Sequence, residues 1–408
     1  MTHKNAGTGI LTALAIAAAG TMSTAQAVEP MPYNDGPIKF IPSVKLSQGY
    51  DDNVDERPDD EESSNVTKVA PTFLFRAEER RNRYQFRYTP SLERYSHDSD
   101  DNRVNHRAAA NSRMVFDARN RLDLGLNARR NQATLTSTNV DNEEDEGDIN
   151  ERFDLNGTYR FGAAAARGQF ELDAGYVWNR YANHLEGGSN NQSEEYDSPR
   201  VGATFFWRVA PKTQLLIEGR YQDYDYTWDE STLDSTNMSA FVGATWRATA
   251  KTSGSVRVGQ QDKEFDEAGK VDEDTTSWEA EVTWRPMNRS TVQVSTSNTL
   301  EEGSEGAAGE AFEETVEQTE YALSWSHDWD ERVSSNVRLS FRDKDYLGAD
   351  IVNDDRNDEL TTASVGVSYA VERWLDVGIE TRFKENDSTN EDAEYDRNTY
   401  FLTATLSL

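Results

Sequence analysis

The residues best suited to chemistry in this sequence are its five histidines. A nucleophilic Ser–His pair requires both side chains within hydrogen-bond reach on one strand edge. His97 and His184 fall in expected loops, His106 begins an expected strand, His327 lies at an expected turn, and His3 belongs to an expected leader peptide. Because no such pair is indicated, we expect a protein that is not an enzyme and needs no cofactor.

Two runs of acidic residues offer oxygen ligands, at residues 51–55 and 141–145. Oxygen-rich clusters can hold Ca²⁺, but neither run has the spacing, glycine and closing glutamate of an EF-hand loop. We therefore expect solvated, negatively charged loops and no metal site. A weaker alternative is that divalent ions bridge these loops to the phosphates of lipopolysaccharide.

Charged and aromatic side chains also recur on the polar face of stretches that alternate with apolar residues, as strands with two unlike faces do. If these faces line a channel, they could hydrogen-bond the hydroxyl groups of a passing sugar, or simply pair with one another and keep the wall rigid. The candidate lining residues are Arg129, Arg160, Asp173, Glu218, Arg220, Tyr224, Arg338, Arg342, Glu380 and Arg382.

The elements that carry these residues are repeated hairpins. Trp207 precedes a tight turn with Pro211, after which Leu215 and Ile217 alternate with polar neighbours. The same aromatic-plus-turn pattern recurs around Trp246, Trp284 and Trp325, with a weaker copy at Tyr369, at spacings of 39, 38, 41 and 44 residues. A roughly fixed period predicts repeated hairpins and not separate domains.

Short turns alternate with longer, mostly acidic connections along the whole chain, as in barrels with short periplasmic turns and long external loops. The sequence predicts an all-β fold, a transmembrane antiparallel up-and-down barrel of about 18 strands, with about 16 also compatible. An even number lets the first strand pair with the last and removes the sheet edges.

Aromatic residues gather where strands meet the short turns, as an interfacial girdle requires: Phe75, Phe116, Phe161, Trp207, Trp246, Trp284, Trp325 and Tyr369. A soluble β-sandwich would also alternate. The girdle, the charges in mid-strand and a C-terminal strand ending at Leu408 favour a barrel facing lipid. That last strand is similar to the signal by which the barrel assembly machinery recognises outer-membrane proteins, although the usual terminal aromatic is missing.

The N-terminus predicts a secretory signal peptide over residues 1–27, with an apolar run and the small-residue site Ala25-Gln26-Ala27. Residues 28–35 are expected to be a short periplasmic segment and residues 36–408 the barrel. The chain contains no cysteine, so disulfides cannot stabilise the exported protein. A formal charge of -32 argues against nucleic acid as a partner.

The chain resembles the outer-membrane β-barrel porins associated with exopolysaccharide gene clusters, on Tyr50-Asp51-Asp52-Asn53-Val54 and on hairpins such as residues 246–258. The resemblance covers about residues 40–408. It implies an outer-membrane channel of a Gram-negative bacterium that exports a polysaccharide made by a Wzx/Wzy-type pathway, with a periplasmic export protein delivering the polymer. It implies no catalytic residues.

Two other functions remain open. A general diffusion porin for small solutes would narrow its lumen with an inward-folded segment, and residues 301–320 are long enough to serve. A surface adhesion or matrix-anchoring protein would instead use its acidic loops. In all three cases outer-membrane lipids and lipopolysaccharide surround the barrel.

Overall fold

The computed structural model describes residues 31–32, 37–99, 101–133, 148–183, 191–229, 231–305, 311–348 and 356–407, and within them forms one closed antiparallel barrel. Eighteen consecutive strands pair with their chain neighbours and β19 pairs with β2, which confirms the predicted fold. A two-residue strand, β1 (Met31–Pro32), adds to β2 at its start. The barrel strands are β2 (Ile38–Asp51), β3 (Ser64–Glu79), β4 (Asn82–Tyr95), β5 (Arg103–Val115), β6 (Asn120–Gln132), β7 (Ile149–Phe161), β8 (Gly168–Tyr181), β9 (Tyr196–Ala210), β10 (Thr213–Tyr226), β11 (Ser235–Trp246), β12 (Thr252–Phe265), β13 (Glu273–Met287), β14 (Ser290–Glu305), β15 (Ala311–Asp328), β16 (Val333–Leu347), β17 (Asn357–Glu372), β18 (Leu375–Ser388) and β19 (Tyr395–Ser407).

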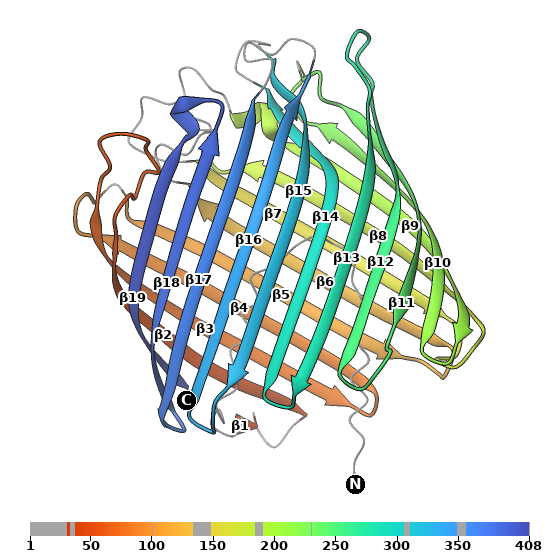
Figure 1. Ribbon diagram of the computed structural model, residues 1–408, viewed down its shortest axis with the longest axis horizontal. Coiled ribbons are helices and arrows are strands. Elements are labelled where there is room, and N and C mark those ends of the chain that lie inside the picture. The colour runs from red at the N-terminus through yellow and green to blue at the C-terminus, as the bar shows by residue number, and fades with distance from the viewer. Residues whose placement is uncertain are drawn as a thin grey trace.

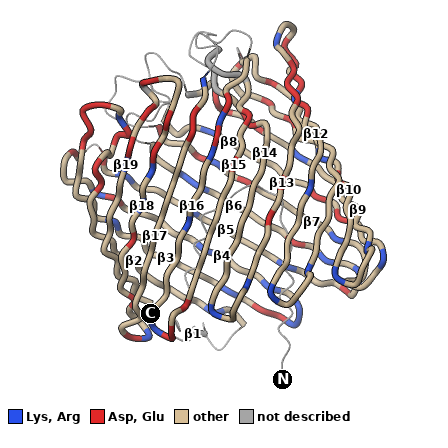
Figure 2. The backbone as a smooth tube through the Cα atoms, viewed as in Figure 1, with Lys and Arg blue, Asp and Glu red and all other residues tan. Residues whose placement is uncertain are grey.

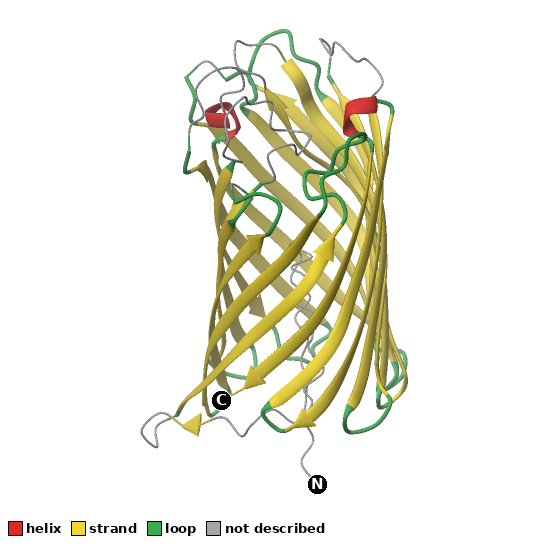
Figure 3. Ribbon diagram, turned by 90° about the vertical axis from the view of Figure 1, so that its left-hand side faces the viewer, coloured by secondary structure: helices red, strands yellow, loops and turns green. Residues whose placement is uncertain are grey.

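The barrel has an oval cross-section, because it is broader in Figure 1 than after the quarter turn of Figure 3. Short turns connect neighbouring strands at one end of the barrel, here called the turn end, and the C-terminus lies there. Longer connections gather at the other end, the loop end, with two short 3₁₀ turns, η2 (Asn191–Glu194) and η3 (Glu391–Ala393). Figure 2 shows Lys and Arg collected at the turn end and Asp and Glu enriched at the loop end.

The outer and inner faces differ as period-2 alternation requires. On β10, Ile217 is 64% exposed while its neighbour Glu218 is 6% exposed, and on β19 Leu402 is 65% exposed. The apolar side chains therefore point outward and the polar ones into the lumen. This is the inverse of a soluble protein, in which contiguous apolar surface of this extent would be buried.

The predicted girdle aromatics lie on this outer surface at the turn end of the strands. Phe116, Phe161 and Trp207 are 62%, 51% and 43% exposed, and Phe75, Trp284 and Tyr369 are exposed as well. Trp246 and Trp325 are half-buried, and the indole nitrogen of Trp325 donates to the Ser290 hydroxyl at 3.0 Å. Aromatic rings in such positions suit the boundary between hydrocarbon and headgroups.

The joint between β13 and β14 is irregular. Their ladder ends at Trp278 and Asn298, although β13 begins at Glu273 and β14 continues to Glu305. Beyond this point β14 pairs only with β15, and both curve away from β13 toward the loop end in Figure 1. We call residues 298–305 of β14 and 311–317 of β15 the inward hairpin. Glu and Gly in residues 301–314 favour a loop, but residues 301–305 and 311–314 are strand, because Leu300 and Glu317 continue the β14–β15 register.

Within the described part of the chain, no helix has the length and apolar character needed to cross a membrane.

A charge placed on the outer face should destabilise the barrel. Ile217→Lys puts an ammonium at a strongly exposed apolar position of the outer face, and we expect a loss of roughly 2–4 kcal/mol in the free energy of unfolding. Ser295→Lys is the matched control, because Ser295 faces the lumen opposite Glu281. Urea unfolding of protein refolded into lipid vesicles measures both. Equal losses for the two variants would mean that lipid does not contact the outer face.

Candidate functional site: the lumen of the barrel

The ten lining residues predicted from sequence occupy the inward parity of their strands, and the structure engages them unequally. Arg160 is ion-paired with Glu171, and Asp173 accepts a hydrogen bond from the Thr158 hydroxyl at 2.6 Å. Arg342 lies 3.6 Å from Glu320, and Glu380 binds the Lys45 ammonium at 2.6 Å. Glu218, Arg220 and Tyr224 lie in clusters described below. Arg129, Arg338 and Arg382 form no ion pair with any described residue.

A compact charge network joins β10, β12 and β13 in the middle of the lumen. Arg220 donates to Glu218 and to Glu279, both at 2.6 Å, and Arg257 donates to Glu218 at 2.8 Å. The Arg220 guanidinium also lies 4.7 Å from the ring centre of Phe241, which is buried. Two cations and two carboxylates cancel one another, so this part of the wall is polar yet carries no net charge.

The β14 arm of the inward hairpin rests on the inner face of β12, while residues 315–317 of its β15 arm stay paired with β16 in the wall. The Gln261 amide of β12 donates to the Leu300 carbonyl and accepts from the Leu300 N–H, at 3.1 and 3.2 Å. Glu302 accepts from Lys263 of β12 and from the Tyr226 hydroxyl of β10, both at 2.9 Å. The Lys263 side chain is fully buried. The hairpin therefore narrows the lumen at the loop end.

An aromatic cluster adjoins this constriction. Tyr196 of β9 packs against Tyr224 and Tyr226 of β10, with ring centres 5.4 Å apart in both pairs. Arg152 of β7 donates to the Tyr196 hydroxyl at 2.7 Å. Tyr224, predicted from sequence to line the lumen, is thus packed in a cluster beside the hairpin. The Lys263 ammonium lies 5.8 Å from the centre of its ring.

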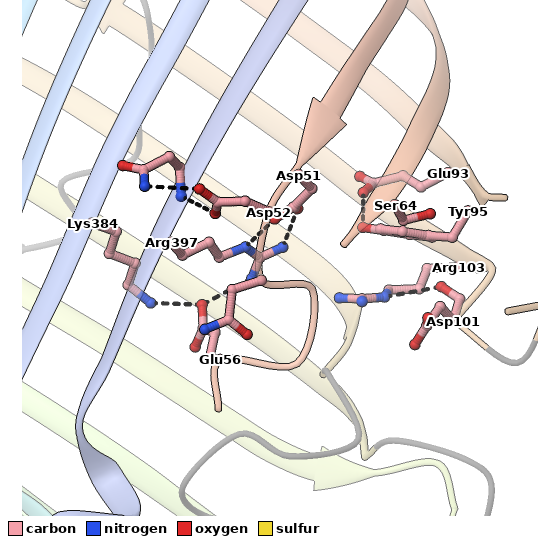
Figure 4. A network of polar contacts seen from close by, with 12 residues as sticks. Asp51, Asp52, Glu56, Ser64, Glu93, Tyr95, Asp101, Arg103, Lys384 and Arg397 are labelled. Carbon is pink, nitrogen blue, oxygen red and sulfur yellow. Dashed lines mark hydrogen bonds and ion pairs between the residues drawn. The ribbon is translucent and has the colours of Figure 1, made fainter. Parts of the chain in front are cut away.

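The first loop, residues 52–63, also folds over the lumen. Figure 4 shows Arg397 of β19 between Asp51 and Glu56. Its guanidinium holds both Asp51 oxygens, at 3.0 and 2.7 Å, and Glu56 at 2.9 Å, and Lys384 binds Glu56 at 2.9 Å. Asn53 anchors the loop by donating to the Asp396 carbonyl at 2.9 Å.

The expectation that residues 51–55 form a solvated loop is therefore wrong. Asp51, Asn53, Val54 and Asp55 are all buried. Val54 packs on Val66 and Tyr95, which present an apolar patch on the inner face. Burial of the carboxylates is tolerated because arginine and lysine from distant strands neutralise them. The other acidic run, residues 141–145, lies outside the described residues.

Asp101, at the loop end, gives the first loop a pH dependence. Burial raises the pKa of this carboxyl to about 6, and the charges of Asp55, Asp98 and Glu62 add to the rise while Arg103 opposes it. A raised pKa means that the folded state favours the protonated acid, so its stabilising contribution is full below the ordinary value of 3.8 and is lost as pH rises through about 6.

We therefore expect hydrogen-exchange protection of the amides in the first loop to fall as pH increases from about 4 to about 6, after correction for intrinsic exchange. Asp101→Asn should remove this step, because the amide does not titrate. A step of the same size in the variant would assign the titration to another group.

The histidines of the described residues have structural partners. The His106 ring and the Tyr88 hydroxyl form a hydrogen bond of 2.8 Å. His97 lies 3.2 Å from the Glu62 carboxylate, and the ring centres of His327 and Trp329 are 4.5 Å apart. His184 is outside the described residues. Among the residues described, no group of three or more His, Asp or Glu side chains is arranged to hold a metal ion.

Several lumen residues were not singled out from the sequence, among them Arg257, Arg397, Glu279 and Lys263. Alternation alone could have found Arg257, since it lies between Val256 and Val258. Nothing in the sequence pairs Arg397 with Asp51, because 346 residues separate them and only closure of the barrel brings them together.

The family model described as Putative beta-barrel porin 2 matches residues 27–408. No curated protein sequence matches the chain. Among solved structures, OpdL of Pseudomonas aeruginosa is similar with a TM-score of 0.47 and 12% identity, over 90% of this chain and 99% of its own. OccAB4 of Acinetobacter baumannii gives 0.44 and 10%, over 93% and 100%.

Proposed function

Because the chain belongs to the Putative beta-barrel porin 2 family and is an outer-membrane β-barrel porin, we propose that it is a passive, non-enzymatic channel through which a secreted polysaccharide leaves the cell. A signal peptide over residues 1–27 would bring the chain to the periplasm, and the barrel assembly machinery would insert it among outer-membrane lipids and lipopolysaccharide. A periplasmic export protein would deliver the polymer.

The observation that supports this proposal is the chemistry of the wall. Charges in the middle of the lumen are matched in pairs, as with Arg220 and Glu279, and amide side chains such as Asn127 and Asn336 are exposed on the same inward face. A hydroxyl-rich chain needs hydrogen-bond partners to replace its water, and matched charges supply them without a strong field. Such a wall lowers the barrier that hydrocarbon presents to a sugar polymer.

The test uses the full-length protein in planar bilayers, with conductance recorded in the presence and absence of the secreted polymer of its host. We expect the polymer to block the current reversibly from the periplasmic side. In cells, deletion of the gene should abolish secretion, and re-expression should restore it. Unimpaired secretion after deletion would exclude the export function.

A second candidate, a porin for small solutes, is favoured by the inward hairpin. Lys263 and Tyr226 hold Glu302 across the inner face of the wall, so the lumen is narrowed there. A small-solute porin should pass mono- and disaccharides in liposome swelling and show no block by the polymer. The opposite outcomes support export.

A further inference from the structure

Three arginines form a row across adjacent strands on the lumen wall. Arg107 of β5 is directly opposite Arg129 of β6, and Arg129 is directly opposite Arg152 of β7. All three point inward, because the residues that alternate with them, such as Val104 and Leu155, are exposed on the outer face. Directly opposed residues have Cβ atoms about 5 Å apart, and the charges of Arg152 and Arg107 both act on Arg129.

Such a row is costly for a barrel to maintain, because like charges directly opposite each other destabilise a sheet. Many other cations of the lumen are paired with carboxylates, and β5 itself has such a pair at Arg113, whose Nε donates to Asp123 at 2.6 Å. In the row, Arg152 binds only the Tyr196 hydroxyl, at 2.7 Å, among the contacts of the described residues. Arg107 and Arg129 are exposed to the lumen, and no carboxylate of the described residues pairs with them.

The carboxylates nearest to the row are engaged elsewhere. Asp154, two residues from Arg152 on β7, is held by Arg200 at 2.9 and 3.1 Å. Glu301 on the inward hairpin interacts electrostatically with Arg152, but also with Arg342 and Lys344, and accepts from the Gln318 amide at 3.1 Å. The row thus keeps an excess of positive charge that faces water in the channel.

Amide side chains border the row on its loop-end side. Two positions along from each arginine, on the same three strands, stand Asn105, Asn131 and Asn150. The Asn150 amide donates to Asn179 at 3.1 Å, and Asn131 lies opposite Asn150. Asn127 is exposed on the turn-end side of Arg129. Asparagine amides beside guanidinium groups provide both donors and acceptors, which match hydroxyl groups next to an acidic group.

We propose that Arg107, Arg129 and Arg152 form a binding site for an oxyanion carried by a hydroxylated solute, such as the carboxylate or phosphate of an acidic saccharide. The site deepens the proposed channel function by assigning an acidic substrate to it. Planar guanidinium groups bind carboxylate and phosphate oxygens bidentately. The bound anion relieves the repulsion within the row while the asparagines hold the sugar hydroxyls.

The test compares wild type with the double variant Arg107→Gln/Arg129→Gln in planar bilayers. The probes are trigalacturonate, maltotriose and inorganic phosphate. In wild type we expect concentration-dependent, saturable block by trigalacturonate and phosphate but not by maltotriose. In the double variant, the anion concentration that gives half-maximal block should rise at least about tenfold, because each lost arginine removes charge-assisted hydrogen bonds.

Two matched variants separate a site from a diffuse field. Arg338→Gln removes the same charge from the lumen at a position flanked across the strands by Ser324 and Ser364, and should leave the block by trigalacturonate unchanged. Arg129→Lys keeps the charge but loses the planar fork, and should weaken the block by less than Arg129→Gln. Equal effects of Arg338→Gln and Arg129→Gln would overturn the site in favour of general electrostatics.

Two further outcomes would also overturn it. One is block by trigalacturonate that does not differ between wild type and the double variant. The other is block that appears only after the carboxylates of residues 141–145 are neutralised, which would make the row a counter-ion for the chain's own loop. Failure of the export proposal looks different: the anion block would persist in purified protein while deletion left polymer secretion intact.

Discussion

Replacing residues 301–316 by an Asn-Gly turn should raise the single-channel conductance clearly above that of wild type. Leu300 and Glu317 are directly opposite each other in the β14–β15 ladder, so a two-residue turn can join them without strain. The replaced segment carries Glu302, which Lys263 and Tyr226 hold over the inner face of β10 and β12. Its removal widens the path for hydrated ions at the loop end.

The control shortens a connection of the same kind that does not enter the lumen. Figure 1 shows the connection between β12 and β13 rising above the barrel, so residues 267–270 can be replaced by the same turn. We expect its conductance to equal that of wild type. If the shortened β14–β15 variant conducts like wild type as well, the hairpin does not limit the current.

A milder variant covers the case in which the shortened protein fails to assemble. Lys263→Met keeps the length of the buried side chain but leaves Glu302 with the Tyr226 hydroxyl alone. Removing one partner of a buried ion pair costs about 3–5 kcal/mol, because the remaining charge is uncompensated. We expect noisier current with excursions to higher conductance. A steady current at the wild-type level would show that the pair does not fix the hairpin.

Arg397→Met should produce one of the largest losses of stability among single lumen substitutions. The guanidinium neutralises Asp51, whose side chain is 1% exposed, and binds Glu56 in the first loop. Its loss leaves Asp51 buried without a cation, which costs about 3–5 kcal/mol. The damage falls on the joint between β19 and β2, where the barrel closes. Glu56 retains Lys384, so the first loop should loosen but not detach completely.

Arg382→Met is the matched control for this prediction. Arg382 lies on β18 with the same inward parity, opposite Ser364 and Thr399, and has no ion pair among the described residues. We expect its unfolding midpoint in urea to stay close to that of wild type in lipid vesicles, while Arg397→Met lowers it. If the two variants lose the same amount, the Asp51 pair contributes nothing that any lumen arginine would not.

The fold could be predicted from sequence because each strand carries its own signal. Leu215 and Ile217 alternate with Glu218 and Arg220, and this local period fixes which side chains point outward before any neighbour is known. The short turns gave the hairpin partners, and an even number of strands gave closure. These inferences use residues close together in the chain.

The site depended on contacts that no local pattern contains. The inward parity of Arg129 was evident, but its position opposite Arg107 and Arg152 follows from the register of three strands. The acidic character of residues 51–55 suggested a solvated loop, and only the distant Arg397 and Lys384 explain why it is buried. Similarly, residues 301–305 read as loop because Glu and Gly are poor strand formers, and their pairing with β15 overrides that preference.

The joint between β13 and β14 has a mechanical consequence. Above Asn298 the inward hairpin is attached to β12 and β13 through side chains alone, by Gln261, Lys263 and Thr275. The β15 arm pairs with β16 only as far as Thr315. The tip beyond the Glu302–Thr315 pair could therefore move aside without breaking a rung to β13 or β16. Moving this tip would cost a handful of polar contacts, whereas displacing any neighbouring strand would require unzipping a ladder in hydrocarbon, where exposed peptide groups are prohibitively expensive.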